Sequence, residues 1–466
     1  MPAPGLLVKF SSRGIGLKHF QRICLRSFLS DAYKCESEWR ARLNSPVCLK
    51  LQNENLYGEL IKKFNNESRV NAIDVDMFST MITKEANLKE LEDITHRFRR
   101  SPSTVHALPC TGHSVIRTFL EFNKTDTLMR LLDDRLNYGL FLDYYLSNLL
   151  MDTFLKQENY RDAVKVAIQL MLQEEFDHQI TCPLALYSCY AYLKNPQPEP
   201  WEPQPKPKEE EPAEEVKVRV DYLREPYFDD HFDLTDPEHL IGKTLVGFGK
   251  HLARQKAEPL AHSSVLLGWI LFEKYDKALE CLNTICNSSA KPAVFRECLD
   301  LCQKKVTESS KQPDGFMDKW SSLTSQLEKG NLIADGSAME VLKRRITDAV
   351  AAQETKDIQV QAELYKRWEK LREDEIEKEI QALDRQRRLA ILEAKKKELA
   401  EKEERLNFFD NLDDWELKYE EKELERQAQA KELESRSKKI SAKMQRQAEE
   451  DAYFPPEITS RRSGTE

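Results

Sequence analysis

The sequence at residues 144–178 reads YYLSNLLMDTFLKQENYRDAVKVAIQLMLQEEFDH and holds two apolar stripes separated by a polar break at residues 157–159. Within each stripe, apolar residues recur at steps of three and four, which is the period of an amphipathic helix rather than a strand. The stripe residues are Leu146, Leu149, Leu150 and Phe154 before the break, and Tyr160, Ala163, Val164, Ala167, Leu170 and Met171 after it. A three-residue break is too short to let two helices part, so this stretch predicts an antiparallel helical hairpin.

Two further hairpins are predicted upstream, at a spacing of 35 residues. Residues 109–143 and 74–108 each carry two apolar stripes with the same helical period. A weaker copy lies downstream, where KYDKAL (274–279) parallels NYRDAV (159–164). Because one hairpin cannot bury its own apolar face, repeated hairpins predict an all-α solenoid in which neighbouring hairpins cover one another. The periodicity alone leaves an ordinary helical bundle open as the alternative.

Composition divides the rest of the chain into segments. The stretch NPQPEPWEPQPKPKEEEP (195–212) is rich in proline and acid. Proline lacks an amide donor and blocks helix, so this stretch predicts an extended surface insertion. The predicted segments are a solenoid at 29–193, the insertion at 194–230, further helical hairpins at 231–306, a linker with short helices at 307–356, a long charged helix at 357–450 and a flexible tail at 451–466.

The segment 357–450 is dominated by Glu, Lys, Arg, Gln, Ala and Leu, with acids and bases finely mixed. Such a sequence is typical of a long exposed helix supported by ion pairs four residues apart. Its apolar residues fit a heptad only in pieces, so we expect a coiled-coil-like helix and leave its pairing open. The cluster FFDNLDDW (408–415) is the expected interruption or docking point, because its aromatic residues have no core of their own.

Residues 1–28 have the composition of a mitochondrial transit peptide. Five bases occur before the first acid, Asp31, and apolar residues alternate with them at helical spacing. A secretory signal would instead need an unbroken apolar region. The sequence therefore predicts import into the mitochondrial matrix, and the alternative is a basic arm that is never removed.

The whole chain is acidic, with a formal net charge of −9. Acidic proteins do not usually coat nucleic acid non-specifically, so any RNA contact must use local basic patches. The strongest patch is HRFRR (96–100), which supplies Arg97, Arg99 and Arg100, and a weaker one is Lys62-Lys63. These five side chains are the candidate RNA-binding residues; the alternative is that they form a solvated face or pair with acids on the adjacent hairpin.

No catalytic, cofactor-binding or metal-binding site is predicted. Gly242-Lys243-Thr244 imitates the end of a phosphate-binding loop, but Pro237 occupies the position of the first glycine. The nine His show no metal-ligand spacing, and the ten Cys are irregularly spaced, with Cys281, Cys286, Cys298 and Cys302 interpreted as small core residues. The longest apolar run, VLLGWILF (265–272), is too short to span a membrane. We therefore expect no enzyme activity, no small-molecule substrate and no membrane partner.

The hairpin at 144–178 resembles a pentatricopeptide repeat. Asn148 fills position five of that repeat, Ala163 fills the small position twenty, and Asp143 fills the last position of the preceding unit. The resemblance implies a helical-hairpin solenoid, and in that family positions five and thirty-five usually read single-stranded RNA. The pairs here are Phe78/Leu108, His113/Asp143 and Asn148/His178, and none is a standard reading pair. We therefore expect a scaffold that meets structured RNA by shape and charge.

The layout as a whole resembles the pentatricopeptide-repeat proteins of the mitochondrial ribosome's small subunit. The segments that carry this likeness are LSDAY (29–33), FRRSP (98–102), NYGLFLDYYLSNLLMDTFLKQENYRDAV (137–164) and AELYKRWEKLR (362–372). It implies a structural component of that subunit, whose partners are small-subunit ribosomal RNA and other mitochondrial ribosomal proteins. The alternative is a free RNA-processing or translation factor with the same repeats. An RNA-cleaving enzyme would need an acidic metal-binding domain, which the sequence does not offer.

Overall fold

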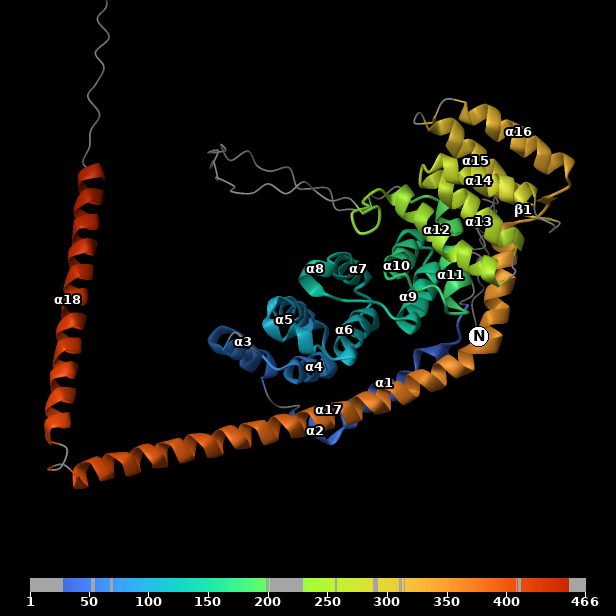
Figure 1. The fold of residues 1–466 in the computed structure, drawn as a ribbon. Helices are drawn as coiled ribbons and strands as arrows, with labels where there is room; N and C mark the ends of the chain where they lie inside the picture. Colours follow the sequence, from blue (N-terminus) through green and yellow to red (C-terminus); the bar gives the residue numbers. More distant parts are fainter. Residues whose placement is uncertain are drawn as a thin grey trace, which may run out of the picture. The chain divides into compact units, whose positions relative to one another are not determined.

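The computed structural model describes residues 28–51, 55–67, 70–197, 201, 229–255, 258–287, 292–309, 312–313, 315–407, 409 and 412–451. Nearly all of these residues are in helices (Figure 1). The α-helices are α1 (Glu36–Ala41), α2 (Pro46–Leu51), α3 (Leu56–Glu67), α4 (Ala72–Met81), α5 (Leu88–Arg100), α6 (Pro109–Glu121), α7 (Thr125–Asp133), α8 (Arg135–Tyr138), α9 (Tyr144–Lys156), α10 (Tyr160–Leu172), α11 (Thr181–Lys194), α12 (Pro237–Arg254), α13 (Glu258–Leu271), α14 (Tyr275–Cys286), α15 (Arg296–Glu308), α16 (Phe316–Lys329), α17 (Ala338–Leu406) and α18 (Leu412–Asp451). The 3-10 helices are η1 (Asp31–Lys34), η2 (Arg42–Asn44), η3 (Glu85–Asn87) and η4 (Pro102–His106), and the short strands β1 (Val294–Phe295) and β2 (Ile333–Ala334) pair in parallel.

The predicted hairpins form at the predicted places. The helices α4 and α5, α6 and α7, α9 and α10, and α13 and α14 pack in pairs, and α4, α6, α9 and α11 contact one another in succession. The apolar stripes of the hairpin at 144–178 are buried, with Leu150, Phe154 and Ala163 each at 0 % exposure. One apolar core runs from Leu29 to Val350. The predicted all-α solenoid class is confirmed, and the 35-residue pattern reflects helices that cover one another's apolar faces.

The turn between paired helices has a common backbone design. Asn123, Glu158, Glu174 and Glu273 adopt positive φ directly after a helix end. The amide that follows each of them donates to a carbonyl five residues back, which satisfies a helix-end acceptor. These bonds run from Lys124 to Phe119 (3.0 Å), Asn159 to Phe154 (2.9 Å), Glu175 to Leu170 (3.1 Å) and Lys274 to Trp269 (3.1 Å). Asn159 then caps α10 by accepting from the Asp162 amide, so one short polar break ends one helix and begins the next.

The helices α12 and α13 approach each other closely through two glycines. A Cβ atom added to Gly242 would lie 2.7 Å from the Gly268 carbonyl oxygen, and one added to Gly268 would lie 2.6 Å from the Gly242 carbonyl oxygen. Gly242-Lys243-Thr244 is thus the middle of a helix and not the end of a phosphate-binding loop. The glycine in that motif is explained by packing between helices.

The chain forms two compact units, residues 1–376 and 377–466. The first unit contains all the hairpins and the first part of α17, whose Leu342, Ile346 and Val350 are buried in the core. The boundary predicted at residue 357 therefore falls inside α17 rather than at a helix start, because charged residues and core residues share this helix. The second unit holds the rest of α17 and α18, and residues 380–400 of it are all exposed.

Parts of three predicted segments lie outside the described residues. They are residues 1–27 of the predicted transit peptide, residues 198–200 and 202–228 of the predicted insertion, and residues 452–466 of the predicted tail. Of the predicted interruption at 408–415, residues 412–415 begin α18, Phe409 lies between α17 and α18, and residues 408, 410 and 411 are not described. These segment boundaries stay predictions.

Candidate RNA interface

The basic cluster predicted at residues 96–100 lies at the C-terminal end of α5. Leu91, Ile94 and Phe98 bury one face of this helix, so the bases are displayed on the other side. Bases in the last turn also suit the negative end of the helix dipole. Arg97 donates from Nε to Asp93 Oδ2 at 2.9 Å, Arg99 donates to the Leu136 carbonyl at 3.4 Å, and Arg100 is exposed. Arg99 and Arg100 have no carboxylate partner among the described residues, whereas Arg97 does.

The two candidate lysines on α3 both have acidic partners. Lys62 Nζ lies 2.9 Å from Glu59 Oε1, and Lys63 pairs with Asp74 at the start of α4. An RNA phosphate would have to compete with these carboxylates. The structure does not bring Lys62 and Lys63 into contact with the bases of α5.

A cavity of about 400 Å³ lies beside Arg99, between the end of α5 and the start of α6. Phe98, Tyr138, Phe141 and Trp368 contribute aromatic walls. Phe141, which lines the cavity, is an exposed apolar side chain at 56 % exposure, and Val105 and Leu136, close in sequence to the lining residues Thr104 and Tyr138, are exposed at 82 % and 85 %. A basic side chain, aromatic rings and exposed apolar side chains thus occur together near this end of α5.

The side chains at position five of the repeats are covered by other parts of the chain. His113 Nε2 lies 3.1 Å from the Tyr365 hydroxyl, and its ring lies 4.9 Å from that of Trp368; both partners belong to α17. Asn148 donates to the Tyr33 hydroxyl at 3.0 Å. Phe78 packs against Tyr57 of α3. Each position is therefore occupied by an intramolecular contact.

The side chains at position thirty-five of the repeats also make intramolecular contacts. Asp143 lies 3.5 Å from His113 Nδ1, and His178 lies 3.2 Å from Asp357 of α17. Leu108 packs in a small apolar cluster that includes Ile376. The side chains at positions five and thirty-five are thus engaged within the chain, several of them by Tyr33 or by α17.

A buried ion pair positions α17 on the hairpins. Arg372 Nε donates to Asp76 Oδ2 of α4 at 2.6 Å, and Thr111 of α6 donates to Asp76 Oδ1 at 2.7 Å. Burial is the largest effect on the pKa of Arg372 and lowers it, but the charge and hydrogen bond of Asp76, together with the nearby Cys110 and Cys48, raise this pKa overall. The carboxylate therefore joins three helices while both of its oxygens are hydrogen-bonded.

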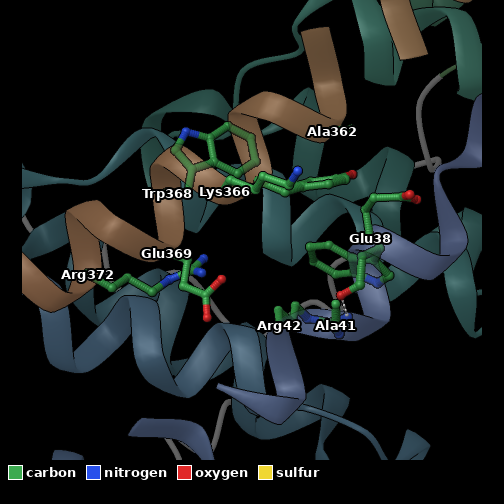
Figure 2. A pocket seen from close by; sticks show the side chains of 10 residues that line it. Glu38, Ala41, Arg42, Ala362, Lys366, Trp368, Glu369 and Arg372 are labelled. Carbon is green, nitrogen blue, oxygen red and sulfur yellow. Dashed lines mark hydrogen bonds between the residues drawn. The ribbon is translucent and has the colours of Figure 1, made fainter. Parts of the chain in front are cut away.

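The helix α1 meets α17 at a second contact, which Figure 2 shows from close by. A cavity of about 170 Å³ there is lined by Trp39 and Arg42 from α1 and η2, and by Tyr365, Trp368 and Arg372 from α17. The Arg42 guanidinium lies 3.5 Å from the centre of the Trp39 ring. Burial raises the pKa of Tyr365 to about 12, so this hydroxyl stays protonated and can donate at neutral pH.

Sequence reasoning missed these α17 contacts. Its one signal was the pair Tyr365 and Trp368, two aromatic residues within a charged helix, which require a partner surface. In the described part of the chain, no three His, Cys, Asp or Glu side chains are grouped as metal ligands would be. No described helix is both long and apolar enough to cross a bilayer. The nine described cysteines are all free.

The family described as mitochondrial 28S ribosomal protein S27 matches residues 8–398 of the 466 residues. The match includes every hairpin and most of α17, and it confirms the resemblance drawn from the sequence. The chain therefore belongs to the mitochondrial 28S ribosomal protein S27 family and is a component of the small subunit of the mitochondrial ribosome.

Proposed function

We propose that this chain is a non-enzymatic scaffold that meets small-subunit ribosomal RNA through phosphate contacts on its outer surface. Arg99 and Arg100 on α5 are the central contacts, with Arg97, Lys62 and Lys63 as secondary ones. The proposal rests on a difference in ion pairing among these five basic residues. Arg99 and Arg100 have no carboxylate partner among the described residues, whereas the other three bases do.

The chemistry of arginine supports recognition of RNA phosphates rather than nucleobases at Arg99 and Arg100. The guanidinium of Arg presents several donors in a fixed fork that matches phosphate oxygens, and such contacts position a protein without reading sequence. In a chain with net charge −9, a few unpaired bases supply most of the local attraction for RNA. The exposed Phe141 beside Arg99 adds an apolar contact for a sugar or base face.

The intramolecular contacts at positions five and thirty-five of the repeats favour a scaffold over a free factor that reads RNA sequence. His113, Asn148 and His178 already bind Tyr365, Tyr33 and Asp357 within the chain. A reading function would require α17 and the N-terminal segment to leave, which would expose buried apolar residues and the charge of Asp76. Neighbouring ribosomal proteins are the second class of partner that we propose, through the exposed Val105 and Leu136.

The experiment compares the double variant Arg99→Ala/Arg100→Ala with Arg40→Ala/Arg367→Ala. The control also removes two charges, but its arginines pair with Glu36 and Glu363 four residues earlier. Binding of the full chain to a transcript of mitochondrial small-subunit ribosomal RNA is measured across a salt series. We expect the first variant alone to bind more weakly, with a slope against log salt that is shallower by about 1.4–1.8, since each phosphate contact contributes roughly 0.7–0.9.

Two results would count against the proposal. Unchanged affinity for the transcript, together with a lower melting temperature, would show that Arg99 and Arg100 stabilise the fold instead. A loss of affinity for the ribosomal transcript but not for an RNA with the same base-paired structure and a different sequence would show sequence reading rather than phosphate contact.

A further inference from the structure

The part of α17 that lies in the second unit contains a basic segment, RQRRLAILEAKKK (385–397). Three Arg and three Lys stand against one Glu in these thirteen residues, although the whole chain has a net charge of −9. Every side chain of the segment is exposed. This is the strongest local excess of positive charge on the described surface of this helix.

Most of these bases lack the ion pair that several other bases of α17 and α18 form. Elsewhere on α17 and α18, Arg367, Lys402, Arg436 and Lys438 each pair with a Glu four residues earlier. Within the segment, Arg387 lies 4.0 Å from Asp384. Among the residues that the structure describes, Arg385, Arg388, Lys395, Lys396 and Lys397 have no acidic partner. Their charges are therefore available to a partner outside the chain.

Four of the bases lie on one face of the helix. Arg385, Arg388, Lys395 and Lys396 follow the three- and four-residue steps of one helical face, with Leu392 between them. From Arg385 to Lys396 this face is about 16 Å long at ~1.5 Å per residue. An exposed helix with one continuous basic face complements a row of negative charges.

We infer that residues 385–397 of α17 form a second RNA-binding element, whose basic face lies along the phosphate backbone of structured ribosomal RNA. The inference deepens the proposed function and rests on it, because it takes ribosomal RNA as the partner. It adds a separate contact to the one at Arg99 and Arg100. The segment falls within the matched residues 8–398, so it lies in the part of the chain that the family model describes.

A second copy of the chain does not fit this face. In a heptad that places Leu392 and Leu399 at one core position, the other core position holds either Lys396 or the pair Arg388 and Lys395. A coiled-coil dimer would therefore bury bases at its seam, which costs stability.

An acidic protein fits less well than RNA. Protein interfaces need an apolar core from which charges are depleted. Here Leu389, Leu392 and Leu399 share one helical face, but Arg388, Lys395 and Lys396 lie on that same face and interrupt the apolar row. The face is therefore mainly basic, which suits phosphates. An α-helix with its side chains is about 10–12 Å wide, and the major groove of an RNA helix is narrow, so the helix lies along the backbone rather than in that groove.

The test uses the full chain with Arg385, Arg388, Lys395 and Lys396 all changed to Gln. The matched control changes Arg367, Lys402, Arg436 and Lys438 to Gln; it removes the same charge from bases that are already paired. Glutamine is a good helix former, so neither variant should lose helix, and circular dichroism verifies this. The probe is the transcript of mitochondrial small-subunit ribosomal RNA, measured across a salt series beside Arg99→Ala/Arg100→Ala.

We expect the first variant to bind the transcript at least tenfold more weakly near 0.1 M salt, with a slope against log salt shallower by about 3 to 4. The control should stay within twofold of the parent chain. Full affinity in the first variant would overturn the inference, as would weak binding in both variants, which would indicate only net charge. If affinity for the transcript falls only in Arg99→Ala/Arg100→Ala, the proposed function stands and residues 385–397 are not an RNA-binding element.

A crosslinking measurement on the assembled small subunit separates the two classes of partner. RNA crosslinks within residues 385–397 support the inference. Crosslinks from these residues to acidic ribosomal proteins alone would overturn it and identify the segment as a protein contact.

Discussion

Arg372 and Asp76 determine how one charged helix finds a single position on the hairpins. The two residues are 296 positions apart, and both are almost fully buried. A buried ion pair adds little net stability compared with well-packed apolar residues, but removing one member leaves an uncompensated buried charge. Its contribution is specificity: only one placement of α17 neutralises Asp76.

We therefore predict that Arg372→Met lowers the free energy of unfolding by about 3–5 kcal/mol. Asp76→Asn combined with Arg372→Met should recover most of that loss, because the amide side chain of the double variant carries no charge and keeps an acceptor for Thr111. Urea unfolding of the full chain measures both effects. Additive losses in the double variant would show that the two residues act independently.

His113 is the second residue whose state depends on α17. Burial lowers the pKa of His113 below its usual range, although Asp143 opposes this effect. The unfolded chain therefore takes up a proton at higher pH than the folded chain does. Stability from this group is complete above the unfolded pKa of about 6.5 and is lost as pH falls towards the folded pKa.

We predict that His113→Gln reduces the dependence of stability on pH between about 7.5 and 5.5, since glutamine can bond to Tyr365 without titrating. His106→Gln is the matched control, because His106 is exposed on η4. The melting temperature of the parent chain and both variants at the two pH values checks this. Equal pH dependence in His113→Gln and the parent would mean that His113 does not remain neutral in the fold.

At the scale of elements, the helices could be predicted because their causes are local. The stripes at 144–178 and the polar break at 157–159 specify α9, the turn and α10 from neighbouring residues alone. Asp236-Pro237 likewise marks the start of α12, where the Asp236 side chain accepts from the Glu238 amide. The strands β1 and β2 were not foreseen, because each has two residues and exists only through pairing across 39 positions.

The close contact between α12 and α13 leads to a prediction about stability. Gly268→Ala places a Cβ 2.6 Å from the Gly242 carbonyl oxygen, a backbone atom that cannot move without shifting α12. We expect a loss of roughly 1–3 kcal/mol from overpacking, although alanine favours helix. Gly336→Ala is the control, because nothing lies within 4 Å of the added atom. Equal stability of both variants would show that the two helices are less tightly packed.

At the scale of the whole molecule, the sequence could not foresee where α17 packs. Hydrogen bonds such as Tyr365 to His113 and Tyr33 to Asp357 join residues more than 250 positions apart, and no periodicity encodes them. The candidate bases were visible as a cluster, but whether each base is free depends on partners such as Asp74 for Lys63, which only the fold brings close. The family match then places the chain in the mitochondrial ribosome, within the matrix.

Processing of the N-terminus gives a further prediction. Asp152 Oδ1 accepts from the Phe28 amide at 2.7 Å and from the Leu29 amide at 3.4 Å, and Leu29 is buried. If residues 1–28 are removed on import, the new amino group of Leu29 gains a positive charge beside this carboxylate. Mass spectrometry of matrix-purified protein should show a chain that begins at Leu29. A chain that still begins at Met1 would contradict the predicted cleavage.

The central claim is that this chain is a permanent structural part of the small ribosomal subunit. Sucrose-gradient sedimentation of mitochondrial matrix extract, with the chain detected in each fraction, tests it most directly. We predict that the chain migrates with small-subunit ribosomal RNA, stays there at moderate salt and moves to the top of the gradient after ribonuclease treatment. A chain that is found mainly at the top of the gradient in untreated extract, away from the subunit, would contradict the claim and indicate a free factor.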